Sequence, residues 1–157
     1  MGSGFTLSSK DFANGGSLNT RFTCVGKNET PSLRWTGAPA GTKTFALIMD
    51  DPDVPTKKAF VHWIVFNIPA TKTGLSHSLK RSKMISDGTK QGSNSLYHIG
   101  FDGPCPPSGK EHRYYFRLYA LDKILDLQPT ITKEQLVKAM EGSILAEAEL
   151  MGTYKRV

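Results

Sequence analysis

Short apolar stretches alternate with glycines and prolines through the first two thirds of the chain. The sequence holds 15 glycines and nine prolines, residues that interrupt regular elements and favour turns. The runs between them are rich in β-branched and aromatic residues, which predict strands over residues 21–24, 44–50, 60–67, 96–101 and 112–122. This pattern predicts a mainly β fold of the sandwich or barrel type.

Two of the predicted strands also indicate where their faces lie. Residues 45–49 are apolar without a break, which is typical of a strand covered on both faces, so we expect a central strand there. Between residues 112 and 120 the side chains alternate between two faces. The face expected in the core carries His112, Tyr114, Phe116, Leu118 and Ala120, and the amphipathic face carries Arg113, Tyr115, Arg117 and Tyr119.

The final third of the chain changes to helical spacing. Thr132 and Gln135 have the spacing of a capping box, whose side chains accept hydrogen bonds from free backbone N–H groups at a helix start. Three apolar residues then recur at helical spacing, namely Leu136, Met140 and Ile144. We expect a helix from residue 132 to about residue 150, weakened near Gly142, and a closing strand over residues 150–156.

Nothing in the sequence divides the chain into parts. No linker, repeat or low-complexity tract interrupts it, and 157 residues suit a single core. We therefore expect one domain over residues 1–157, with residues 1–4 as a cloning remnant because of their Gly-Ser-Gly. Strands followed by a helix favour helices packed at one end or edge of an antiparallel sheet.

The charge and hydropathy of the sequence limit the classes of partner and the cellular location that we expect for this protein. Twenty basic and 14 acidic residues give a net charge of +6, which favours anionic partners. The basic residues are dispersed apart from residues 80–83, and no nucleic-acid-binding module accompanies them, so we expect no nucleic acid partner. No apolar run is long enough to span a bilayer, and the N-terminus lacks the features of a signal peptide. We expect a cytoplasmic protein without a transmembrane segment.

The two cysteines are expected to be reduced. Cys24 and Cys105 are too few for a disulfide framework, and thiols stay reduced in the cytosol. A single bridge between them remains the alternative. Cys105 lies in a proline-rich loop, where it is expected to be a buried, inert thiol, and the alternative is a redox-sensitive gate.

Two rigid loops carry the candidate chemistry. Asp51 and Asp53 follow the apolar strand and are separated by proline, which fixes the backbone. Residues 103–109 form a second Gly-Pro-rich loop that leads into His112. His62 is expected to share a face with Ile64 and Phe66. A polar turn and a buried core histidine are the plain interpretations, but together these groups form a carboxylate and imidazole cluster of the kind found in functional sites.

The same motifs carry a resemblance to a known family. The motif of residues 51–55, the pair His62-Trp63, and the Gly-Pro-rich loop leading into residues 112–114 are similar to the phosphatidylethanolamine-binding proteins. Residues 22–28, 31–35 and 148–154 also resemble the bacterial and archaeal, Raf kinase inhibitor-like branch of that family. The family pattern Gly-x-His-Arg is one residue longer here, from Gly109 to Arg113.

The resemblance implies a fold and a site. The fold is a Greek-key β-sandwich with a few peripheral helices, one of them near the C-terminus. The site is a small pocket for phosphate, phosphorylated groups or phospholipid head groups, without cofactor or metal, lined by Asp51, Asp53, Pro55, His62, Pro107, His112 and Tyr114. Imidazole and phenol groups are expected to donate to the anion, and each aspartate to orient a histidine through a hydrogen bond. The alternatives are an aspartate that is protonated or one that faces the ammonium group of an ethanolamine head.

We therefore expect a non-enzymatic binding module. Because some family members modulate kinases, regulation of kinase signalling is one candidate role. The protein partner would then be a kinase or a protease, and the sequence does not decide between them. A homodimer is also left open. The alternatives are a hydrolase and a protease inhibitor. A phosphatase would use Asp51 as nucleophile and Asp53 as acid, but Pro55 stands where that class has Thr or Val. A metal-dependent hydrolase would use the Asp and His cluster, but no closely spaced ligand pair supports it.

Overall fold

The computed structural model describes residues 4–157. Residues 1–3 lie outside it, and with them most of the expected cloning remnant. The elements in chain order are β1 (Thr6–Ser8), β2 (Gly16–Ser17), the 3-10 helix η1 (Thr20–Phe22), β3 (Leu33–Thr36), β4 (Thr44–Asp51), β5 (Phe60–Pro69), β6 (Gly74–Leu75), β7 (Lys90–Gln91), β8 (Glu111–Leu121), α1 (Lys133–Met140) and β9 (Ile144–Lys155).

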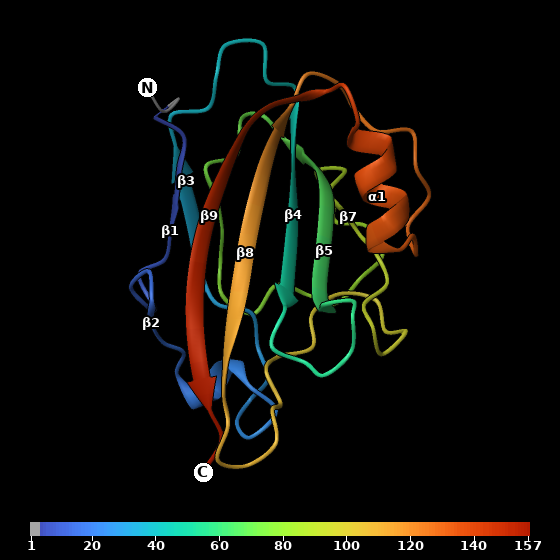
Figure 1. The fold of residues 1–157 in the computed structure, drawn as a ribbon. Helices are drawn as coiled ribbons and strands as arrows, with labels where there is room; N and C mark the ends of the chain where they lie inside the picture. The colour runs from blue at the N-terminus through green and yellow to red at the C-terminus, as the bar shows by residue number, and fades with distance from the viewer. Residues whose placement is uncertain (1–3) are drawn as a thin grey trace.

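Two sheets and one α-helix make up the described part of the chain. A six-stranded sheet has the order β2-β9-β8-β4-β5-β7, and a three-stranded sheet has the order β1-β3-β6. Only the β2–β9 pair is parallel among the strand pairs of these residues. The small sheet and α1 lie at opposite sides of the large sheet (Figure 1). The predicted mainly β fold is confirmed, and β4 is central and buried along its whole length.

The large sheet therefore has a core on each face. Between the two sheets pack aromatic and aliphatic side chains that include Trp35, Trp63 and Phe116. Under α1 pack Ile48 and Phe66 together with Leu136 and Met140 from the helix itself. Burial on both faces explains why β4 and β5 show continuous apolar runs rather than alternation.

The C-terminal helix is shorter than predicted. The capping box of Thr132 and Gln135 is present, but α1 ends at Met140, and the chain then turns through Gly142, whose φ is 78°. Glycine in this left-handed region is a common helix stop. β9 follows at once and pairs with β8 over nearly its whole length, so Ile144, which was predicted on the buried helix face, is 45% exposed in a strand.

Two of the short predicted strands are also wrong. Residues 21–24 form the end of η1 and a turn, because the Asn19 side chain accepts a hydrogen bond from the Arg21 N–H group and caps the 3-10 helix. Residues 96–101 contain no strand. The side-chain oxygen of Asn94 accepts hydrogen bonds from the N–H groups of Leu96 and His98, and this local bonding competes with a ladder.

Within residues 4–157, no helix has the length and hydropathy needed to cross a bilayer.

Candidate functional site

A cavity of about 600 Å³ lies at the end of the large sheet where β4 ends and β8 begins. Figure 1 shows these two strand ends at the lower edge of the sheet. The structure brings all seven predicted residues together around it: Asp51, Asp53, Pro55, His62, Pro107, His112 and Tyr114. Antiparallel neighbours explain the meeting, since the end of one strand lies beside the start of the next.

Asp51 and His112 form a buried pair at the base of the cavity. The Asp51 Oδ2 atom is 2.6 Å from Nδ1 of His112, and both side chains are buried. An ionised carboxylate only accepts hydrogen bonds, so Nδ1 carries the proton of this bond. The other Asp51 oxygen accepts a hydrogen bond from the Asp53 N–H group at 2.7 Å. The pair thus fixes the imidazole and leaves its Nε2 atom for the cavity.

Asp53 does not orient a histidine, contrary to expectation. Its carboxylate accepts hydrogen bonds from Nε and Nη2 of Arg113 at 2.9 and 2.8 Å and from the Arg113 N–H group at 2.8 Å. These bonds hold the pKa of Asp53 below its usual range. Arg113 was predicted only as part of the outer face of its strand, and the bend that brings Asp53 to it has no sequence signal. The paired guanidinium offsets the charge of Asp53 at the cavity.

His62 reaches the cavity because β5 carries a bulge. Met49 pairs with Trp63 but Asp50 pairs with Val61, which leaves His62 as the extra residue. Its ring lies edge-on to Tyr114 with centroids 5.3 Å apart. Ile64 and Phe66 belong to the opposite core, so the prediction that His62 shares their face is wrong. Bulges commonly redirect a side chain in this way.

The proton of the neutral His62 ring is held on Nδ1. That nitrogen lies 2.7 Å from the Asp102 carbonyl oxygen, which can only accept. Burial lowers the pKa of His62 below its ordinary value of 6.5, because desolvation disfavours the charged ring. The Nε2 atom of the neutral ring is then an acceptor.

The lowered pKa of His62 makes stability depend on pH. Above pH 6.5 neither the folded nor the unfolded state carries the proton. Below pH 6.5 the ring is protonated in the unfolded state but still neutral in the folded state. The free energy of unfolding therefore decreases as the pH is lowered, by at most about 1.4 kcal/mol per pH unit for this one group. We expect urea denaturation between pH 7.5 and 5.5 to show a smaller decrease for His62→Gln than for the parent protein. If the free energy of unfolding decreased by the same amount in His62→Gln and in the parent protein, the burial of a neutral His62 would be contradicted.

Tyr114 completes the polar base of the cavity. Burial raises the pKa of its phenol above the ordinary value, so the hydroxyl stays protonated and able to donate at neutral pH. In residues 4–157 no buried side-chain nitrogen or oxygen lacks a hydrogen-bond partner. The Tyr114 hydroxyl and the Nε2 atoms of His62 and His112 take part in no hydrogen bond among the described residues, and all three residues line the cavity, so these three polar atoms are open to it.

The cavity wall includes residues that sequence reasoning missed. Val54, Phe60, Leu96 and Pro106 give the wall an apolar part, and Lys110 adds a positive charge. Leu96 is 49% exposed and next to Tyr97, and its surface position had no periodic signal. A cavity with polar groups at its base and an apolar wall suits a ligand with a polar head.

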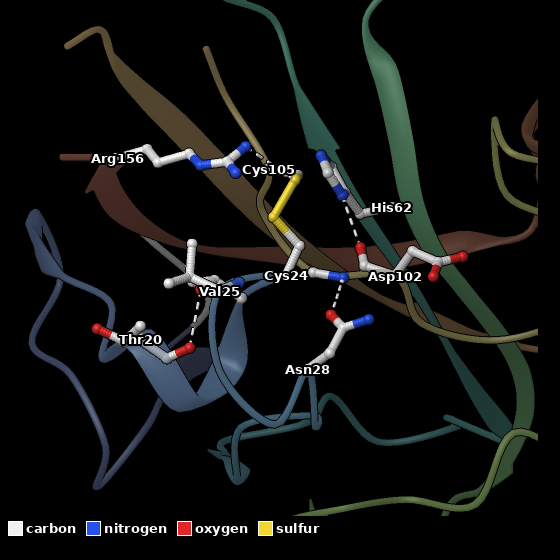
Figure 2. The surroundings of a disulfide bond; sticks show 10 residues. Thr20, Cys24, Val25, Asn28, His62, Asp102, Cys105 and Arg156 are labelled. Carbon is white, nitrogen blue, oxygen red and sulfur yellow. Dashed lines mark hydrogen bonds between the residues drawn. A yellow bond between two sulfur atoms is a disulfide. The ribbon is translucent and has the colours of Figure 1, made fainter. Parts of the chain in front are cut away.

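The Gly-Pro-rich loop forms one wall and is tied by a disulfide. Cys24 and Cys105 are bonded to each other, so the prediction of two reduced thiols is wrong (Figure 2). That prediction was argued from the number of cysteines and the expected compartment, and neither shows that the two Cα atoms lie 5.4 Å apart. Cys105 is also exposed rather than buried. The cytoplasmic location stays a prediction.

The extra residue before His112 is absorbed in a turn. The Gly109 N–H group donates to the Arg156 carbonyl oxygen at 2.7 Å, and the Lys110 N–H group donates to the Pro107 carbonyl oxygen at 3.3 Å. Gly109 has a φ of 84°, which favours glycine. His112 pairs with Tyr154 in the β8–β9 ladder, so its strand position is kept.

The carboxylates of this site are committed to partners. Asp51 is bonded to His112 and Asp53 to Arg113. In the described residues no three side chains of His, Cys, Asp or Glu are grouped so that they could hold a metal ion.

Comparisons with known proteins agree with one another. The model of the phosphatidylethanolamine-binding protein family matches residues 8–155. A UPF0098 protein from Methanothermobacter thermautotrophicus is 48% identical over 150 residues, which cover 96% of this chain and 98% of that protein. A phosphatidylethanolamine-binding protein homologue from Chlamydia trachomatis has a TM-score of 0.90 at 38% identity, covering 99% of both chains. YbcL from E. coli, described as a member of the mammalian family, has a TM-score of 0.90 at 35% identity, covering 98% of this chain and 99% of its own.

Proposed function

Since the chain belongs to the phosphatidylethanolamine-binding protein family, we propose that it is a non-enzymatic binding module whose cavity takes a phosphate-like anion. The anion is free phosphate, a phosphorylated group or a phospholipid head group. The observation that carries this proposal is the convergence of three open polar atoms on the cavity: Nε2 of His62, Nε2 of His112 and the Tyr114 hydroxyl.

The proton positions decide how such an anion binds. With Nδ1 of each ring committed to Asp102 or Asp51, a neutral imidazole presents a lone pair at Nε2. Phosphate oxygens are acceptors, so a bond forms only if Nε2 is protonated or the ligand brings a P–O–H or ammonium proton. Because Nδ1 of His112 already donates to the Asp51 carboxylate, a proton that this ring takes up is carried by Nε2. Binding of a fully ionised anion therefore takes up a proton.

The groups at the site suit binding better than hydrolysis. Hydrolysis of a phosphoester needs an activated nucleophile or a positioned water. The Tyr114 hydroxyl keeps its proton, and the Asp53 carboxylate is paired with the Arg113 guanidinium, so neither supplies an activated nucleophile. The apolar wall near Leu96 and Pro106 would contact the non-phosphate part of a ligand.

A constant-charge anion tests the proposal. Sulfate keeps its double charge across the range of interest, so any pH dependence comes from the protein. We expect its affinity to increase from pH 8 to pH 6, by up to about tenfold per pH unit if one proton is taken up. Calorimetry in buffers of different ionisation enthalpy should show the proton uptake directly.

Affinity that is independent of pH, or that falls as the pH is lowered, would contradict the proposed proton uptake. Phosphoethanolamine and a phosphoserine peptide, titrated in parallel, distinguish a lipid head group from a phosphorylated protein as the source of the anion. Release of inorganic phosphate from either probe would show an enzyme instead. A kinase as the partner of this module stays a prediction.

A further inference from the structure

We infer that the Cys24–Cys105 disulfide is a redox-sensitive latch that holds the cavity wall closed, so that its reduction loosens the wall and weakens anion binding. The effect on affinity rests on the function proposed above. The latch itself concerns only the loop of residues 102–110 and the segment of residues 24–28.

The bridge lies at the cavity. Cys105 lines the cavity, and Cys24 lies in the turn that follows η1. Both residues are exposed, so the bridge lies at the surface of the protein. Figure 2 shows the bridge between the end of the Arg156 side chain and His62.

Few other bonds hold this wall. Pro104, Pro106 and Pro107 have no N–H group to donate. The Pro104 carbonyl oxygen accepts a hydrogen bond from the Cys24 N–H group at 3.1 Å, and Gly109 is bonded to Arg156. Among residues 105–108, only Cys105 is bonded to another segment of the described chain. Its sulfur forms the disulfide and accepts a 3.6 Å hydrogen bond from Arg156 Nη1. The covalent bond is thus the main tether of residues 105–108.

The same two segments also hold His62. The Asp102 carbonyl oxygen accepts the His62 Nδ1–H bond, and the Asp102 N–H group donates to the His62 carbonyl oxygen at 3.1 Å. The next N–H group, that of Gly103, donates to Asn28 Oδ1 at 2.7 Å. The segments are so close that a Cβ atom on Gly103 would lie 2.6 Å from Asn28 Oδ1. Separation of the segments would therefore also disturb the hydrogen bond that orients His62.

The redox step is ordinary thiol–disulfide exchange with a low-molecular-weight thiol. A thiolate attacks Cys24 Sγ, the S–S bond breaks, and Cys105 leaves as a thiolate next to the Arg156 guanidinium, which stabilises the negative charge. A second thiol then resolves the mixed disulfide and releases the Cys24 thiol. Two thiols are oxidised to one small disulfide, and the protein disulfide gains two electrons and two protons.

Binding and redox state must affect each other equally. If oxidation strengthens anion binding by some factor, saturating anion makes reduction harder by the same factor. For this two-electron couple a tenfold difference in affinity corresponds to a shift of about 30 mV in the reduction potential.

The affinity arm compares three samples with inorganic phosphate as the probe. These are the oxidised protein, the same protein reduced with dithiothreitol, and the variant Cys24→Ser/Cys105→Ser. We expect phosphate to bind at least about fivefold more weakly to the reduced protein and to the variant. The variant controls for the reagent, because dithiothreitol should not change its affinity further. Equal affinities of the oxidised and reduced protein would overturn an effect of the latch on binding.

A second arm needs no ligand. Hydrogen exchange of the Gly103 and Gly109 amides, which donate to Asn28 and Arg156, should become at least about tenfold faster on reduction, while the Leu47 amide in β4 should not change. If exchange increases but phosphate binds to neither form, the latch stands and the proposed function fails. If exchange in residues 102–110 is unchanged by reduction, the latch is wrong whatever phosphate does. Far-UV circular dichroism of the reduced protein reports whether the sheet is intact.

Discussion

Replacing His112 with alanine should weaken phosphate binding by about ten- to a hundredfold, because one charge-assisted hydrogen bond contributes roughly 1.5 to 3 kcal/mol. The variant also leaves the buried Asp51 carboxylate without its imidazole partner. Calorimetric titration at pH 6.5 measures the loss. His77→Ala is the matched control, since His77 is bonded to Asp11 and lies outside the residues that line the cavity. Unchanged affinity in His112→Ala would place the anion elsewhere on the protein.

Asp51→Asn separates two roles of the carboxylate. If Asp51 positions His112, the amide should weaken phosphate binding, by about tenfold on the scale known for groups that orient a binding imidazole. If the carboxylate mainly repels the anion, Asp51→Asn would tighten binding instead.

Replacing Phe116 with alanine should lower the free energy of unfolding by about 3 to 5 kcal/mol, through lost burial and the cavity that remains. Phe116 is fully buried in the centre of β8, and its ring centroid lies 5.5 Å from that of Phe12. Urea denaturation measures the change. Tyr97→Ala is the matched control, because Tyr97 is 90% exposed, and its loss should change stability by no more than about 0.5 kcal/mol. A cost below about 1 kcal/mol for Phe116→Ala would contradict the two-sided core.

The parts of the fold that the sequence predicts are those with strong burial. β4 is apolar because both of its faces are covered, and β8 alternates because one face is in the core. Both patterns are local and survive in a single sequence. The short strands β1, β2, β6 and β7 have two or three residues each, too few to show any period.

Site residues at the ends of strands were predictable from the sequence. Contacts that depend on a β-bulge or on the pairing of residues far apart in the chain were not. Asp51 and His112 were identified because they lie at the end and start of recognisable strands. The bulge that redirects His62 adds one residue to a ladder, and the sequence has no signal for it. The pairing of Asp53 with Arg113 likewise joins residues 60 positions apart.

The helix boundary and the disulfide show two further limits. Ile144 continues the helical spacing, but Gly142 stops the helix and β9 gains a full ladder with β8. Tertiary pairing thus overrides local periodicity. The cysteines are 81 residues apart, and only the folded chain shows that they meet.

Nitrogen chemical shifts of the histidine rings give the most direct test of the anion site, because the chain has four histidines and two of them line the cavity. In a titration with inorganic phosphate, we expect the Nε2 signal of His112 to move saturably toward the protonated form and the Nε2 signal of His62 to shift with the same saturation, while the signals of His77 stay in place. Saturable shifts at His77 with no change at His62 and His112 would contradict the proposed anion site.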